Sequence, residues 1–288
     1  MTRVLVTGAT GNVGRHVVAG LGARGVPVRA FSRDAGRAAQ ILGPGTDIAT
    51  GDFADPHSLR RALDGADRMF LCCPNDVRQV EYGTHAVEAA AAAGVGHLVM
   101  LSTVGAEPGA ESVFADQHGR IEQHVRTEEI DHVILRSGFL MSNILGSLRA
   151  VRETGRFFLP GGSARVAAVD PRDVGACAAA LLAGPGRGIR SYVVTGPEAL
   201  TFEAFARELS AGTGRTIEFT DVTDDDAVEG LVRAGRSRWL AEGIVGMFEA
   251  LREGVNSRTT DTVQQLTGQE PRSAVDFARD ILKPLLTS

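Results

Sequence analysis

Short apolar runs alternate with amphipathic stretches along the first two thirds of the chain. The runs are rich in β-branched residues, as buried strands are, whereas the stretches between them are Ala-rich with helical periodicity. The pattern predicts strands at 4–6, 26–31, 47–50, 69–72, 98–101, 132–135 and 191–195, and helices at 13–23, 58–63, 79–93, 117–127 and 171–183. Unbroken apolar strands that alternate with helices predict an α/β fold with a Rossmann-type, doubly wound parallel sheet.

The alternation loosens after residue 139. Residues 141–153 predict a helix, 156–162 an irregular exposed turn, and 197–288 a mainly helical region with one strand at 216–220. We therefore expect a Rossmann domain at 1–155, with 171–196 returning to its sheet. Residues 156–288 are expected to form mainly a smaller helical cap over one end of that sheet.

A glycine-rich loop separates the first predicted strand from the first predicted helix. In dinucleotide-binding loops the first glycine permits a sharp turn, the second admits a pyrophosphate, and the third lets the helix pack against the strand. The positive end of the helix dipole then faces the phosphates. The alternative is a tight turn without a ligand. The predicted cofactor contacts in this loop are Gly8, Thr10, Gly11, Asn12, Val13 and Gly14.

The end of the second predicted strand bears on the choice between NADP and NAD. An acidic residue about 20 positions beyond the glycine loop binds the ribose hydroxyls in NAD-binding proteins. Here the strand is followed by Arg33 and Asp34, after Ser32. The planar guanidinium of Arg33 suits a 2′-phosphate, and Ser32 can add a hydroxyl. We predict NADP(H); the alternative is a solvated Arg33 paired with Asp34.

Composition excludes some classes of function. The net charge is −5, without a basic run or a long apolar segment, so neither a nucleic-acid surface nor a membrane span is expected. Three cysteines and no signal-like N-terminus predict a reducing cytoplasm. Histidine spacing predicts no metal site. Tyr82 and Tyr192 are the two tyrosines and Lys283 is the sole lysine, which nearly excludes chemistry that needs a Tyr–Lys pair.

Several segments carry a resemblance that extends over nearly the whole chain. They are residues 7–14, 51–53, 135–143, 192–201 and 266–268. They resemble the NmrA-like group of atypical short-chain dehydrogenases, and especially its type 2 NAD(P)H-dependent quinone oxidoreductases. The resemblance implies an NADPH-dependent reductase whose cofactor lies along the carboxyl ends of the strands.

The resemblance also implies roles for residues beyond the glycine loop. Asp52 and Phe53 would flank the adenine, Cys72, Cys73 and Pro74 would lie along the ribose, and Ser137, Gly138 and Phe139 would reach the nicotinamide. The acceptor would lie between the 138–140 segment, the residues after the fifth strand and the cap. Its predicted contacts are Thr103, Val104, Phe114, Leu140 and Asn143, with Phe139, Phe157 and Phe158 as further candidates for an aromatic wall.

The usual proton relay of short-chain dehydrogenases is absent. That relay is a Tyr-x-x-x-Lys pair on the helix after the fifth strand, in which lysine lowers the pKa of tyrosine. Phe114 and His118 stand at this spacing here. The predicted catalytic residues are His118 and Ser102, since a histidine side chain ordinarily titrates near neutral pH. The alternatives are a surface or ribose-contacting histidine and a strand-end capping serine.

A missing acid favours a particular class of acceptor. Reduction of a quinone yields a weakly basic phenolate that can take its proton from water, so no positioned acid is required. We therefore predict an NADPH-dependent reductase of a quinone or polycyclic aromatic compound. Two alternatives stay open: a non-catalytic NADP(H)-sensing regulator that binds a protein partner, and a natural-product reductase or cyclase with a non-quinone substrate. The oligomeric state is also left open.

Overall fold

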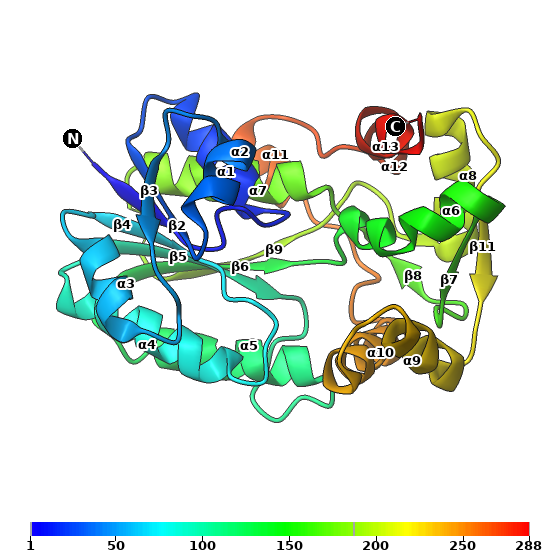
Figure 1. Ribbon diagram of the computed structural model, residues 1–288, viewed down its shortest axis with the longest axis horizontal. Helices are drawn as coiled ribbons and strands as arrows, with labels where there is room; N and C mark the ends of the chain where they lie inside the picture. The colour runs from blue at the N-terminus through cyan, green and yellow to red at the C-terminus, as the bar shows by residue number, and fades with distance from the viewer. Residues whose placement is uncertain (1, 187, 288) are drawn as a thin grey trace.

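Seven strands build the central sheet of the computed structural model, which describes residues 2–186 and 188–287 (Figure 1). They are β1 (Val4–Val6), β2 (Val28–Ser32), β3 (Asp47–Thr50), β4 (Arg68–Leu71), β5 (His97–Thr103), β6 (Asp131–Ser137) and β9 (Arg190–Val194). All neighbours pair in parallel, in the order β3-β2-β1-β4-β5-β6-β9. This order confirms the predicted Rossmann-type sheet.

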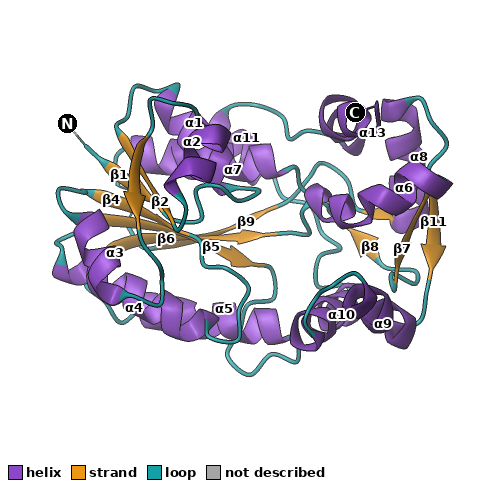
Figure 2. Cartoon of the chain, viewed as in Figure 1, coloured by secondary structure: helices purple, strands orange, loops and turns teal. Residues whose placement is uncertain are grey.

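Helices cover both faces of the sheet, as Figure 2 shows. One face carries α1 (Gly14–Gly22), α2 (Ala35–Leu42), α7 (Pro171–Ala183) and α11 (Thr262–Thr267), and the other carries α3 (Pro56–Leu63), α4 (Gln79–Ala92) and α5 (Val113–Val125). Successive residues of a strand point to opposite faces. Val4 and Val6 accordingly join the core under α1 and α7, while Leu5 joins the core under α3 and α4. Within the described residues, no helix is long and apolar enough to cross a membrane.

The cap is built around a third core, at the carboxyl-terminal end of the sheet. Its elements are η1 (Met141–Ser147), α6 (Leu148–Thr154), β7 (Arg156–Leu159), β8 (Arg165–Val166), β10 (Leu200–Thr201), α8 (Phe202–Thr213), β11 (Glu218–Asp221), α9 (Asp224–Arg233), α10 (Arg238–Arg252), α12 (Ala274–Phe277), η2 (Ala278–Leu282) and α13 (Lys283–Thr287). Phe139 contributes to this core and packs edge-on against Phe202, with ring centroids 5.8 Å apart. We retain the division near residue 155 as a proposal.

The segment 156–162 differs from the predicted irregular exposed turn. Its first four residues form β7, which pairs in parallel with β11. Phe157 is completely buried and packs against Phe219, with ring centroids 5.5 Å apart, whereas Phe158 is exposed. The prediction of an irregular exposed turn was wrong for these four residues, because alternation along a short strand buries one of the two adjacent phenylalanines and exposes the other.

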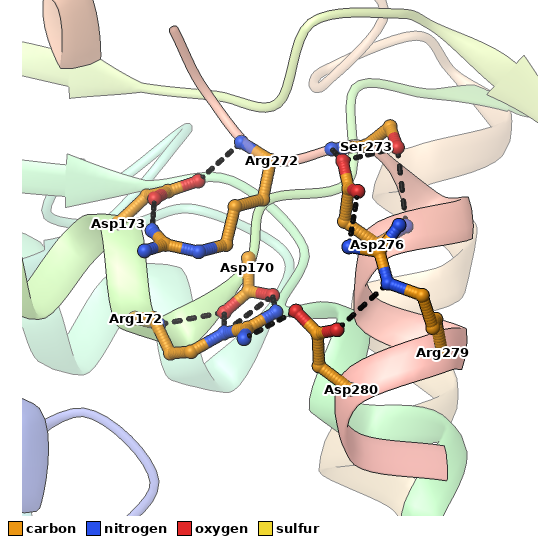
Figure 3. A network of polar contacts seen from close by, with 8 residues as sticks. All are labelled: Asp170, Arg172, Asp173, Arg272, Ser273, Asp276, Arg279 and Asp280. Atoms are coloured by element: carbon orange, nitrogen blue, oxygen red, sulfur yellow. Dashed lines mark hydrogen bonds and ion pairs between the residues drawn. The ribbon is translucent and has the colours of Figure 1, made fainter. Parts of the chain in front are cut away.

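A network of ion pairs attaches the carboxyl-terminal segment to α7 (Figure 3). The fully buried Asp170 accepts a hydrogen bond from the backbone N–H of Arg172 at 2.8 Å, and so caps α7. The Arg172 guanidinium donates to Asp170 at 2.7 Å and to Asp280 of η2 at 2.9 Å. Asp173 accepts from both the backbone N–H and the guanidinium of Arg272. These contacts hold the last helices of the cap against a helix of the sheet domain.

Candidate active site

A cavity of about 460 Å³ lies at the carboxyl ends of the central strands, bounded on the far side by α10 of the cap. The carboxyl ends of parallel strands are where open α/β sheets bind ligands. The fold brings most of the predicted site residues into its wall. These are Gly8, Gly11, Asn12, Val13, Gly14, Cys72, Cys73, Ser102, Thr103, Val104, Phe114, His118, Ser137, Gly138, Phe139, Leu140 and Asn143.

The glycine loop has the shape that a pyrophosphate requires. Gly8 adopts a φ of +60°, where the chain turns sharply from β1, and a Cβ on Gly14 would lie 2.1 Å from the carbonyl oxygen of Gly8. No side chain of the described residues caps the start of α1. Within the described residues, the backbone N–H groups of Asn12, Val13 and Gly14 also donate to no acceptor. The loop therefore offers unpaired donors at a helix N-terminus, which fits a dinucleotide phosphate.

The two charged residues after β2, Arg33 and Asp34, differ in their contacts. Asp34 caps α2, because its carboxylate accepts from the backbone N–H of Arg37 at 2.9 Å. Arg33 is exposed and, within the described residues, forms no ion pair or side-chain hydrogen bond. The helix α2 was not predicted. Because Asp34 caps this helix, its presence after β2 is explained without a contact to the ribose hydroxyls of NAD. The assignment of Arg33 to a 2′-phosphate stays a prediction.

Replacing Arg33 with alanine is expected to weaken NADPH binding by about 10-fold to 100-fold, since a charge-assisted hydrogen bond contributes about 1.5–3 kcal/mol. Affinity for NADH, which lacks the 2′-phosphate, should change by less than about twofold on the same grounds. Fluorescence titration with both dinucleotides measures the two constants. Arg236→Ala, at an exposed arginine of the cap, is the charge-matched control. An equal loss of affinity for NADPH and NADH would contradict the assignment of Arg33 to the 2′-phosphate.

The two predicted adenine contacts lie outside the cavity wall. Phe53 is 9% exposed and packs edge-on against Phe31, with ring centroids 5.7 Å apart. Asp52 accepts a hydrogen bond from the backbone N–H of Ala54 at 2.9 Å. Both residues thus shape the end of β3, and their contact with adenine stays a prediction. Of the other predicted cofactor contacts, Thr10, Arg33 and Pro74 also lie outside the wall.

The two cysteines after β4 are neutral wall residues. Burial raises the pKa of Cys72 to about 11 and also raises the pKa of Cys73, so both thiols stay protonated near neutral pH. A protonated thiol is a poor nucleophile. Cys72 lies against the turn at Gly8, where an added Cβ would meet its carbonyl oxygen at 3.0 Å. These residues position the glycine loop beside β4.

His118 differs from the expectation that it titrates near neutrality. Burial lowers its pKa to about 4, so the imidazole is neutral at pH 7. Its Nε2 lies 3.3 Å from Nε2 of Gln79, while its Nδ1 has no partner among the described residues. Phe114, one turn earlier on α5, packs against Trp239 of α10 with ring centroids 6.0 Å apart. The positions of the usual Tyr–Lys pair therefore hold an aromatic ring and a neutral imidazole.

Ser102 belongs to a buried polar network around Glu122. Its hydroxyl donates to the completely buried Glu122 carboxylate at 2.6 Å. Arg136 donates to the same carboxylate at 2.9 and 2.6 Å, and Arg126 donates at 2.8 Å. Burial opposes ionisation of Glu122, but the hydrogen bonds from Arg136 and Ser102 outweigh it and lower the pKa. The Ser102 hydroxyl proton is engaged with the Glu122 carboxylate, so towards a ligand the Ser102 oxygen can only accept a hydrogen bond.

The cap was expected to border the acceptor, but none of the cap residues that line the cavity was predicted. A helix face that lines a cavity, as that of α10 does, has the same apolar periodicity as one that packs on protein, so the pattern does not distinguish the two. Phe157 and Phe158, which were expected in an aromatic wall, lie elsewhere in the cap. The unpredicted lining residues include Asn75, Leu101, Glu111, Gly246, Met247, Glu249, Ala250, Leu251, Glu253, Val255 and Asn256.

Comparisons with known proteins agree with this architecture. The model of the NmrA-like family matches residues 1–273. The chain is 38% identical to (4-alkanoyl-5-oxo-2,5-dihydrofuran-3-yl)methyl phosphate reductase of Streptomyces griseus, over 96% of this chain and 97% of the relative. It is 33% identical to NAD(P)H azoreductase of Xenophilus azovorans, over 96% of each chain.

A solved structure extends the likeness to three dimensions. The NADPH-dependent quinone oxidoreductase of Escherichia coli, complexed with NADPH, superposes with a TM-score of 0.84 at 25% identity. The match covers 96% of this chain and 98% of that one. The extent of the family match and the shared fold lead to one conclusion: the chain belongs to the NmrA-like family.

Proposed function

We propose that this protein transfers a hydride from NADPH to a quinone or polycyclic aromatic acceptor, without a Tyr–Lys proton relay. The reductase class and the cofactor accord with the relatives, which include an NAD(P)H azoreductase and a quinone oxidoreductase bound to NADPH. The observation that carries the proposal is the cavity, because it joins the glycine-rich loop, with its unpaired backbone donors, to an apolar wall. Pockets of this kind and of about 300–1,000 Å³ hold small ligands.

The residues of the wall suit a flat apolar acceptor. Phe114, Phe139, Leu140 and Met247 come from α5, the β6 end and α10, and they line the same cavity. Such a wall excludes water and holds an aromatic ring in a fixed orientation, which supplies acceleration without acid catalysis. The cavity would be unnecessary in a non-catalytic sensor, where the space beside the dinucleotide can be filled.

His118 would contribute a hydrogen bond rather than a proton. A neutral imidazole carries one N–H and one lone pair, so it can donate to the oxygen that becomes negative during reduction. The proton that completes the hydroquinone then comes from water. Because the pKa of His118 is lowered to about 4, this hydrogen bond does not change between pH 5.5 and 8.

Steady-state NADPH oxidation with small and polycyclic quinones tests the function. We expect turnover above the spontaneous rate, with kcat/KM independent of any histidine titration between pH 5.5 and 8. His118→Ala should lower kcat/KM by about tenfold, the effect of one hydrogen bond to a charged group. His57→Ala, at an exposed histidine of α3, is the control and should leave kcat/KM unchanged.

Three outcomes would decide against parts of this proposal. A loss of about 1,000-fold or more in His118→Ala would indicate true proton transfer. A step in the pH profile near 6.5 that the variant abolishes would contradict a neutral His118. Tight NADPH binding with no turnover on any acceptor would favour the sensing regulator and direct the search to a protein partner.

A further inference from the structure

Asn256 is a buried amide without a hydrogen-bonding partner at the edge of the proposed active site. It follows α10, is only 3% exposed, and lines the cavity. Both Oδ1 and Nδ2 lack a partner among the described residues. Most buried polar side-chain atoms in proteins are hydrogen-bonded, because an unpaired one loses its bonds to water without replacement. Two such atoms in the wall of a cavity indicate a side chain that binds a ligand there.

The backbone around Asn256 is hydrogen-bonded to the cap and to the sheet. Its carbonyl oxygen accepts a hydrogen bond from the backbone N–H of Ala167 at 2.8 Å. Four residues later, the backbone N–H of Thr260 donates to Thr195 Oγ1 at 2.8 Å, and the Thr260 hydroxyl donates to the Val193 carbonyl at 2.8 Å. These bonds join the segment to β9 and the residue after it. Asn256 is therefore fixed between the residue after β8 and the end of β9, on the stretch of chain that leaves the cap.

The amide side chain lies directly against Gly138, which follows β6. A Cβ at Gly138 would lie 2.8 Å from Asn256 Oδ1 and 3.0 Å from Nδ2, so only glycine leaves room for it. The two amide atoms have almost no exposed surface in this position. To contact a ligand, the Asn256 amide must therefore rotate about its side-chain torsions. The hydrogen bonds that Oδ1 and Nδ2 then form with the ligand favour this rotation.

The chemistry of the two free atoms selects the ligand group. Nδ2 donates and Oδ1 accepts, so one partner that satisfies both must present an acceptor and a donor side by side. A primary carboxamide has this arrangement. Quinone and azo groups offer acceptors only and would leave Oδ1 unpaired. The nicotinamide ring carries a primary carboxamide, and its expected position is beside the 137–139 segment that Asn256 contacts.

We propose that Asn256 binds the nicotinamide carboxamide through paired N–H···O hydrogen bonds, and so fixes the rotation of the ring beside Gly138. This inference rests on the use of NADP(H) in the proposed function, but not on the identity of the acceptor. It makes Asn256 a cofactor-binding residue that comes from beyond α10 and not from the sheet.

The test compares two cofactors in two proteins by equilibrium titration. In the reduced 3-acetylpyridine analogue of NADPH, a methyl group replaces the carboxamide –NH2, so the bond to Oδ1 is lost. We expect the wild type to bind NADPH about tenfold more tightly than the analogue, and Asn256→Ala to bind the two equally. Adenosine 2′,5′-bisphosphate, which has no nicotinamide, should bind both proteins alike and shows that the rest of the site is intact.

A second variant separates a binding role from a structural one. Asn256→Leu keeps the size of the side chain but removes the unpaired amide, so its melting temperature should equal or exceed that of the wild type while its NADPH affinity falls about tenfold or more. A lower melting temperature with unchanged affinity would overturn the proposal. A tenfold preference for NADPH that persists in Asn256→Ala would also overturn it, as would an increase in KM for the acceptor alone. All the binding readouts stand whether or not any acceptor is reduced.

Discussion

Replacing Gly14 with alanine is expected to weaken NADPH binding by at least about 100-fold and to lower the free energy of unfolding by about 3 kcal/mol. The new Cβ would lie 2.1 Å from the carbonyl oxygen of Gly8, which is backbone and cannot turn aside. The start of α1 must then move away from the end of β1. That movement displaces the free N–H groups of the loop, each of which would bond a phosphate oxygen. Titration with NADPH and urea unfolding measure the two effects.

Gly22, near the end of the same helix, gives the matched control. A Cβ at Gly22 would meet nothing within 4 Å, so Gly22→Ala should leave NADPH affinity unchanged. Its stability should stay equal or rise by up to about 1 kcal/mol, since alanine favours helix more than glycine does. A Gly14→Ala protein with wild-type affinity would show that the close contact between loop and helix is not needed for phosphate binding.

Replacing Glu122 with glutamine is expected to lower the free energy of unfolding by about 3 kcal/mol at pH 7. The change leaves Arg136, Arg126 and Ser102 directing hydrogen-bond donors at a neutral side chain that is completely buried. Glu122 joins α5 to the ends of β5 and β6, so the variant should also loosen the helix that carries Phe114 and His118. Urea unfolding gives the stability, and acceptor turnover reports on the site.

The pH dependence of this effect follows from the pKa of Glu122. Its pKa in the folded protein lies below the ordinary value of 4.5, so its contribution is fully present above about pH 4.5 and is lost as the pH falls. The stability difference between wild type and Glu122→Gln should therefore shrink in acid. Glu153→Gln, in an exposed pair with Arg149, is the control and should cost less than about 0.5 kcal/mol. An equally large effect at both sites would contradict the role of burial.

The local patterns of the chain were enough to predict its sheet. The strands at 4–6 and 47–50 and the helix at 171–183 agree with β1, β3 and α7 to the residue. Each of these has a short-range signal: an apolar run with polar limits, or an Asp–Pro helix start. The missed strand β7 offers only four residues of alternation, which is weak evidence. The missed helix α2 does carry a start signal in its N-cap Asp34, but that residue was interpreted only as a partner of Arg33 or of a ribose.

The tight geometry of the glycine loop could be predicted because it depends on contacts between residues close together in the chain. Gly8 and Gly14 are only six positions apart, and the strand, turn and helix that they join are continuous. The protonation state of His118 could not be predicted in this way. Its pKa depends on burial among residues of other elements, including Gln79 of α4. The sequence around His118 does not show which distant residues surround it.

The sequence by itself thus determined the α/β class, the parallel sheet, the tight glycine-rich turn and the absence of a Tyr-x-x-x-Lys pair, because each depends on neighbouring residues or on composition. Only the tertiary structure decided which helix closes the cavity, that Ser102 donates to Glu122, and that Asn256 reaches Gly138 across more than a hundred residues. Those contacts depend on how the cap folds back over the sheet. Packing between elements distant in the chain sets that arrangement, and apolar periodicity reports that a face is buried without reporting what covers it.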